Sequence, residues 1–141
     1  KDMFCYGVYT ASHRINRAYA PHLRALGLTY PQYITLTLLW EHAPQTVSEL
    51  AAQLGMQTST LTPLVKRLEK LGHVIRTRGE NDKREVYVSL TPAGAALHQK
   101  APAITSCMIA GTSLSEVELG QLQSLLRRLS DGLQDQPPLA R

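Results

Sequence analysis

The chain has 141 residues, of which 43% are hydrophobic and 18% charged, and its formal net charge is +4. The length suits one domain, and the composition is that of a folded globular protein rather than a disordered one. No apolar run approaches the ~18 residues of a membrane span, and the basic start lacks the apolar stretch of a signal peptide. We therefore expect a cytoplasmic protein.

The residue types needed for common cofactor and metal sites do not recur at the right spacing. Two cysteines are too few for a disulfide framework and lack the spacing of a zinc site. The five histidines never fall three or four residues apart, so no helix carries a pair of metal ligands. The glycine motifs of nucleotide-binding and hydrolase folds are also missing. We expect no cofactor, no metal and no enzymatic activity.

Two helices are predicted in the first third of the chain. Apolar residues recur at helical spacing over residues 4–26, and Gly27 follows where glycine ends a helix. Thr29 and Gln32 then form a capping-box pattern, with Pro31 in the first turn. A second, mostly buried helix should follow.

The next segment predicts two further helices joined by a short turn. Thr46 and Glu49 form a second capping box, which opens a helix through Leu54. Gly55 makes the turn, and Thr58 is expected to cap a longer helix over residues 58–71. Helix, short turn and helix form a helix-turn-helix.

The hydrophobic pattern changes after Gly72. Residues 74–78 and 85–90 are β-branched, partly alternating runs, and residues 79–83 between them are polar and turn-forming. They predict a β-hairpin, which we call the wing. The fold class is therefore mainly α with a small β-hairpin, a winged helix-turn-helix over about residues 30–91.

The last part of the chain predicts helices again. Thr91 and Pro92 open one, which should be interrupted near Pro102. A third capping box over residues 115–118 precedes a leucine-rich helix over residues 119–133.

The helix expected over residues 58–71 has two different faces. Leucines and Val65 gather on one side, and hydroxyl-bearing and basic residues on the other. Seven Lys or Arg side chains and four Asp or Glu side chains lie between Lys66 and Glu85, so most of the net charge is in this segment. A basic surface favours a polyanion, although a solvated surface of mixed charge is the simpler alternative.

A helix with this layout, followed by a basic wing, predicts binding to double-stranded DNA, because residues near the helix N-terminus reach base edges and cations hold phosphates. A wing arginine can also enter a narrow minor groove. Asp82, two residues before Arg84, is placed to orient its guanidinium. The expected DNA-binding residues are Gln57, Thr58, Ser59, Thr60, Thr62, Lys66, Arg67, Arg76, Arg78, Lys83 and Arg84.

The first 33 residues hold five of the six tyrosines and Cys5. Cys5 and Tyr9 are one turn apart on one helix face. Tyr19 shares that side of the helix but lies about 21 Å further along its axis. Tyr19 could therefore approach Cys5 only from a second, antiparallel copy, and Tyr30 could join it. The alternative is that Cys5 is a small buried hydrophobe and the tyrosines are packing residues.

The segments 61–69 and Asp82-Lys83-Arg84 resemble the MarR family of winged-helix transcription regulators. The segments 4–9, 28–33 and 39–41, together with Tyr19, resemble its organic-hydroperoxide-sensing OhrR branch. The resemblance implies a single domain over 1–141 and a homodimer intertwined through residues 4–28 and 92–134. It also implies a pseudo-palindromic operator.

The resemblance further assigns redox roles. It makes Cys5 the peroxide-reactive thiol, Tyr9, Tyr19 and Tyr30 its thiolate-supporting residues, and Cys107 the resolving thiol of the two-cysteine type. The expected function is a repressor that releases its operator when an organic hydroperoxide oxidises Cys5. The resulting sulfenic acid then forms a disulfide with Cys107 of the other subunit, or with a small external thiol.

Three alternatives remain from the sequence alone. A repressor of the same family released by a phenolic or apolar ligand would respond without oxidant and without a thiol. A thiol peroxidase would turn peroxide over continuously with a reductant. An architectural DNA protein would lack one preferred operator over bulk DNA.

Overall fold

The computed structural model describes residues 3–134 and 139. The chain forms two compact units, Lys1–Thr105 and Ser106–Arg141. The first unit contains the helix-turn-helix and the sheet. The second contains the end of one helix and the last helix of the chain.

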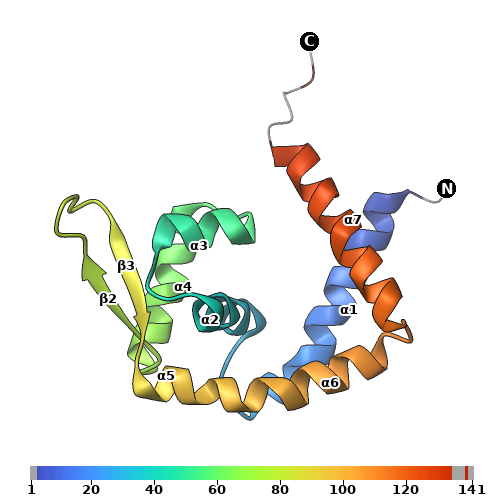
Figure 1. Cartoon of the computed structure of the whole chain (residues 1–141), viewed down its shortest axis with the longest axis horizontal. Helices are drawn as coiled ribbons and strands as arrows, with labels where there is room; N and C mark the ends of the chain where they lie inside the picture. Colours follow the sequence, from blue (N-terminus) through green and yellow to red (C-terminus); the bar gives the residue numbers. More distant parts are fainter. Residues whose placement is uncertain (1–2, 135–138, 140–141) are drawn as a thin grey trace. The chain divides into compact units, whose positions relative to one another are not determined.

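Four helices occupy the first half of the chain (Figure 1). They are α1 (Phe4–Arg24), α2 (Tyr30–Glu41), α3 (Val47–Leu54) and α4 (Thr58–Lys70). The capping box that begins α2 is confirmed, since the backbone N–H of Gln32 donates to Thr29 Oγ1 and Thr29 N–H donates to Gln32 Oε1. The helix-turn-helix predicted from the spacing of these segments is therefore present.

Some helix boundaries differ from the sequence prediction by one to three residues. The first helix ends at Arg24 rather than at residue 26, because the chain turns over the next residues and the N–H of Leu28 bonds back to the carbonyl of Leu23 at 3.1 Å. Gly27 has a φ of 70° in this turn, a value that favours glycine. The expectation that Thr58 caps α4 is wrong. Gln57 is the N-cap, its side chain makes no capping bond, and Thr58 is the first helical residue.

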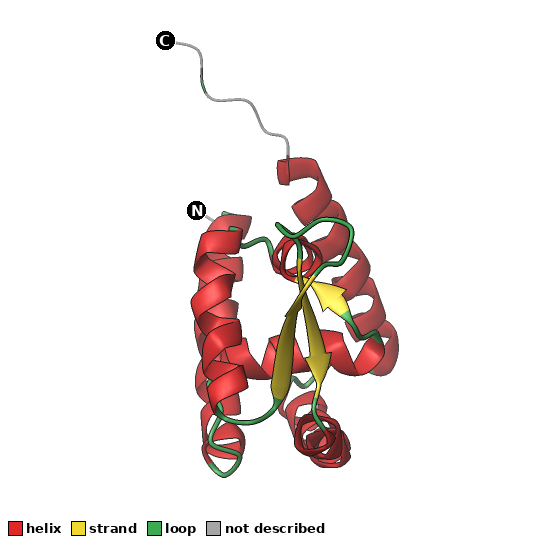
Figure 2. Ribbon diagram, turned by 90° about the vertical axis from the view of Figure 1, so that its left-hand side faces the viewer, coloured by secondary structure: helices red, strands yellow, loops and turns green. Residues whose placement is uncertain are grey.

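The predicted hairpin is confirmed and belongs to a sheet of three strands. Its strands are β2 (Val74–Arg78) and β3 (Val86–Leu90), which pair antiparallel with Arg76 opposite Val88. A short strand, β1 (Gln45–Thr46), pairs with the other edge of β3, giving the order β1-β3-β2. The two long strands lie side by side in both views (Figures 1 and 2). Sequence reasoning missed β1 because a strand of two residues is too short to show an alternating pattern of polar and apolar residues.

The interruption predicted near Pro102 is present. The chain passes from α5 (Pro92–Ala96) through a 3₁₀ turn at Leu97–Lys100 to α6 (Ala101–Gly111). Pro102 has no N–H to donate to the carbonyl of His98, so the helical ladder is broken before it. The last helix, α7 (Glu116–Gln134), begins after the reciprocal bonds of Ser115 and Glu118.

The core of the first unit lies between α2, α3, α4 and the sheet. Its side chains with almost no exposure include Leu36, Leu50, Leu61, Leu68 and Val88. Because α4 buries its leucines here, its other face is left to solvent. Within the described residues, no helix is long and apolar enough to cross a membrane.

Candidate nucleic-acid interface and cysteine site

The helix α4 is amphipathic, as its sequence predicts. Leu61, Leu64, Val65 and Leu68 are buried. On the opposite side, a row of polar and basic side chains is exposed, and Thr62 at its edge is half-buried. The exposed members expected to bind DNA are Gln57, Thr58, Ser59, Thr60, Lys66 and Arg67. They offer hydroxyl and amide groups at the helix start and cations further along.

Arg76 is not a free cation of the wing. Its Nε lies 3.1 Å from Glu69 Oε1 on α4, and its backbone N–H donates to Glu69 Oε2 at 3.2 Å. The backbone hydrogen bond and the guanidinium hold the pKa of Glu69 below its ordinary value. Arg76 therefore ties the base of the wing to α4, and its charge is partly neutralised. Sequence reasoning placed Arg76 with the DNA-facing cations and missed Glu69.

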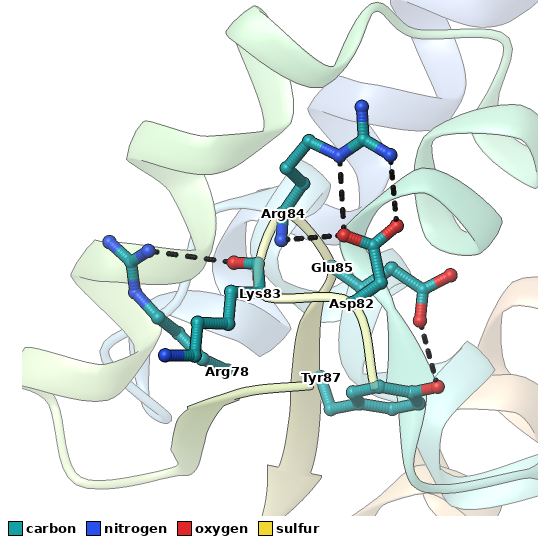
Figure 3. Close-up of polar contacts among 6 residues, drawn as sticks. All are labelled: Arg78, Asp82, Lys83, Arg84, Glu85 and Tyr87. Atoms are coloured by element: carbon teal, nitrogen blue, oxygen red, sulfur yellow. Dashed lines mark hydrogen bonds and ion pairs between the residues drawn. The ribbon is translucent and has the colours of Figure 1, made fainter. Parts of the chain in front are cut away.

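At the wing loop, Asp82 binds Arg84 (Figure 3). One carboxylate oxygen accepts from the Arg84 backbone N–H at 3.0 Å and from its Nε at 3.2 Å, and the other lies 3.4 Å from Nη2. The backbone bond and then the side-chain bond lower the pKa of Asp82. The Arg84 side chain stays 92% exposed, so it is oriented without being covered.

The remaining wing cations are also exposed. Arg78 reaches the backbone carbonyl of Lys83 with its Nη1 at 3.5 Å, and Lys83 itself is exposed (Figure 3). Tyr87 below them donates its hydroxyl to Glu85 at 3.1 Å, and this bond raises the Tyr87 pKa. The tip of the wing thus exposes three cations, Arg78 at the end of β2 and Lys83 and Arg84 in the loop.

Cys5 lies in the first turn of α1 and is exposed. Tyr9, one turn later, is 67% exposed, and its ring packs against His13 with centroids 4.5 Å apart. Cys5 is therefore not buried by its own chain. Cys107, in α6, is also a free and exposed thiol.

Tyr19 and Tyr30 are brought together from different helices. Their rings stack with centroids 4.7 Å apart, and Tyr33 lies 5.7 Å from Tyr19. Burial raises the pKa of both Tyr19 and Tyr30, so both phenols keep their protons at neutral pH and can donate them in hydrogen bonds. Cys5 precedes Tyr19 by about 21 Å of helix, which separates it from this cluster within one chain.

The tyrosine cluster continues into residues that sequence reasoning missed. Tyr33 is 3% exposed and meets Trp40 edge-on at 5.8 Å, and Trp40 stacks on His98 at 5.0 Å. The position of Tyr33, three residues after Tyr30 in the same helix, was the available signal. His98, which stacks on Trp40, is distant in sequence, so no local pattern could have predicted that it joins this cluster.

Comparisons with known proteins agree with this architecture. Residues 28–86 match the MarR family model. The chain is 40% identical to the organic hydroperoxide resistance transcriptional regulator of Bacillus subtilis, over 94% of this chain and 90% of that protein. It is 32% identical to the regulator MgrA of Staphylococcus aureus, over 92% and 88%.

Among solved structures, AbfR of Staphylococcus epidermidis superposes with a TM-score of 0.81, at 32% identity over 94% of this chain and 92% of AbfR. AbfR has also been solved in an overoxidized form bound to DNA, which matches with a TM-score of 0.76 and 33% identity, over 91% and 90% of the two chains. Reduced DNA-bound and disulfide-formed AbfR structures match as well.

An amphipathic helix exposing polar and basic residues, next to a cationic wing, defines a winged-helix DNA-binding protein. With the identities above, the chain belongs to the MarR family. It is a DNA-binding transcription regulator and not an enzyme.

Proposed function

We propose that the protein is a homodimeric repressor that senses organic hydroperoxides through Cys5 and leaves its operator when this thiol is oxidised. The observation that carries the proposal is the exposure of Cys5 and Tyr9 on successive turns at the start of α1. The positive end of a helix favours an anionic side chain, and a phenol hydroxyl can donate to a thiolate.

The relatives support the choice of signal. The Bacillus subtilis protein is named for organic hydroperoxide resistance. AbfR has been solved in reduced, overoxidized and disulfide-formed states, two of them with DNA. The cysteine of this protein is exposed at the start of a helix, and its relatives are linked to oxidation. Both features suit a thiol that reacts with an oxidant better than one that only packs in a core.

A second copy of the chain is part of the proposal. None of the residues of α7 is buried, although the helix carries Val117, Leu122, Leu125, Leu126 and Leu133. A helix with this much exposed apolar surface marks an interaction site. Pairing of α1 and α7 with those of a second copy would cover it. Antiparallel α1 helices would then bring Tyr19 and Tyr30 of one subunit toward Cys5 of the other.

The proposed chemistry has two steps. The Cys5 thiolate attacks the hydroperoxide, so that the O–O bond breaks and Cys5 becomes a sulfenic acid, while the alkoxide leaves and takes a proton from water to become an alcohol. The Cys107 thiol of the partner then condenses with the sulfenic acid, releasing water and forming a disulfide. Closing this bond needs the two Cα atoms within about 7 Å. Any shift of α1 that this requires would move the two wings out of register with the DNA.

On DNA, each subunit would place α4 in one major groove of a pseudo-palindromic operator. Gln57, Thr58, Ser59 and Thr60 would lie near base edges, with Lys66 and Arg67 near phosphates. From the wing, Arg78, Lys83 and Arg84 would reach the adjacent minor groove or its backbone. The ion pair with Glu69 gives Arg76 a role in holding the wing against α4.

The Cys5→Ser variant tests the sensor. It should bind the operator with the affinity of the reduced wild type and stay bound after cumene hydroperoxide, because serine cannot form a sulfenic acid. Electrophoretic mobility shifts before and after oxidant, with wild type beside the variant, measure this. Release of the Cys5→Ser protein by peroxide would show that Cys5 is not the sensor.

The partner of oxidised Cys5 is tested separately. Non-reducing gels of peroxide-treated wild type should show a covalent dimer, and the Cys107→Ser variant should not form it. If wild type stays monomeric on the gel, mass spectrometry of the Cys5 peptide identifies an external thiol as the alternative partner.

A cavity gives a second candidate function. It is an open pocket of about 290 Å³ between α1 and the start of α2, with Asn16, Arg24, Thr29 and Tyr30 among its lining residues. A cation and a phenol beside apolar side chains suit a small phenolic acid. Titration of salicylate without oxidant separates the two functions, since release by a ligand is reversed on dilution and persists in Cys5→Ser.

A further inference from the structure

Thr62 is the half-buried residue at the edge of the DNA-facing side of α4. Its hydroxyl donates to the backbone carbonyl of Thr58, one turn earlier, at 2.8 Å. Thr58, Ser59 and Lys66 share this side of the helix at three- and four-residue spacing. The hydroxyl of Thr62 is thus turned back along its own helix.

This bond decides which part of the Thr62 side chain is available to a ligand. A hydroxyl has one hydrogen, and here it is already used, so Thr62 has no donor left for a base acceptor. The same bond selects one of the two χ1 rotamers open to threonine in a helix. The methyl group on the same carbon atom is left without a polar role. Pro63, which follows, restricts the backbone because its φ is fixed.

We infer that Thr62 is a specificity-determining residue that recognises the C5-methyl group of a thymine by its own methyl group. Thymine is the one base that presents a methyl group in the major groove, and a threonine methyl is among the side-chain groups that contact it. A threonine at this position would normally be expected to act as a hydrogen-bonding residue. With its hydrogen bonded to the Thr58 carbonyl, the hydroxyl can only accept, so it has nothing to offer the O4 acceptor of thymine, and the methyl group is the part of Thr62 that suits this base. The inference rests on the DNA-binding function of the family and not on peroxide sensing.

The test uses the full chain and a duplex that the wild-type protein selects from a random-sequence pool. Each thymine is replaced in turn by deoxyuridine, which lacks only the methyl group. Wild type should lose about fourfold in affinity at one thymine of each half-site, the loss expected from removing one buried methyl-sized group. Replacements at the other thymines serve as internal controls.

Two variants separate the methyl from the hydroxyl. Thr62→Val keeps the methyl and should bind the thymine and uracil duplexes as wild type does. Thr62→Ser keeps the hydroxyl and should bind both duplexes equally, at the level of wild type on uracil. Thr112→Ser is the matched control, because Thr112 makes the same kind of bond, to the Ile109 carbonyl at 2.7 Å, outside the winged helix.

Two outcomes would overturn the inference. One is loss of affinity in Thr62→Val with retention in Thr62→Ser, which would mean that the hydroxyl reads the base. The other is that replacing thymine by deoxyuridine changes the affinity of wild type and of Thr62→Ser by the same factor at every position. This would mean that the thymine methyl group does not contact residue 62.

Discussion

At the scale of single residues, the wing contains two opposed electrostatic effects. Asp82 places a negative charge close to the expected DNA backbone, which disfavours binding. It also accepts from the Arg84 backbone N–H at 3.0 Å and holds the Arg84 guanidinium by two hydrogen bonds, at 3.2 and 3.4 Å. An arginine already held in one orientation loses less conformational entropy when it enters a groove.

We expect orientation to dominate, so Asp82→Ala should weaken operator binding, by about fivefold, the upper range for an exposed ion pair. Glu80→Ala is the control, because it removes the same charge from the same loop and leaves the Asp82–Arg84 contact. Glu80→Ala should bind equally or more tightly. Fluorescence anisotropy at fixed salt measures both, and tighter binding by Asp82→Ala would show that charge alone matters.

At the scale of elements, the start of α5 packs closely on the turn between α4 and β2. A Cβ atom added to Gly94 would collide with the backbone carbonyl oxygen of His73. The carbonyl of Gly94 also accepts the indole N–H of Trp40 at 2.9 Å, which joins α2 to α5. This contact holds the helix that leaves the winged helix-turn-helix against its core.

Gly94→Ala should therefore lower the free energy of unfolding by about 1–3 kcal/mol, the usual cost of forcing an extra carbon into packed structure. Gly111→Ala at the end of α6 is the control, since no atom lies within 4 Å of the Cβ it would add. Urea unfolding followed by circular dichroism measures both. Equal stability of the two variants would contradict the close packing of Gly94 on His73.

At the scale of the whole molecule, the folded chain leaves α7 without a buried residue. If a second copy covers it, a charge on its apolar face should separate the subunits. Leu125 is 57% exposed in the single chain, and Leu125→Glu should shift the protein from dimer to monomer in sedimentation velocity. The separated subunits should also lose affinity for a two-site operator.

Leu71→Glu provides the matched control for this change, because Leu71 is 49% exposed but lies at the end of α4. It should leave the oligomeric state unchanged. A Leu125→Glu protein that sediments as wild type does would place the dimer contact elsewhere.

The order and type of the helices could be predicted from local sequence, because helical periodicity and, for several helices, a capping signal act within a few residues. The capping pairs at Thr29 and Ser115 are such signals, and both form the expected reciprocal bonds. The hairpin followed from its β-branched runs on either side of a polar turn. The amphipathic face of α4 followed from helical periodicity.

Other features depended on contacts between distant segments. The strand β1 exists only because β3 lies beside it, and Arg76 is an anchor of the wing only because folding brings Glu69 to it. Likewise Tyr19 meets Tyr30 across two helices. Periodicity and capping act within one segment. The contacts of a side chain with other segments depend instead on how those segments pack. The sequence alone therefore determined which residues form the polar face of α4 and the basic wing, and only the tertiary structure decided which of these side chains pair with other segments of the chain.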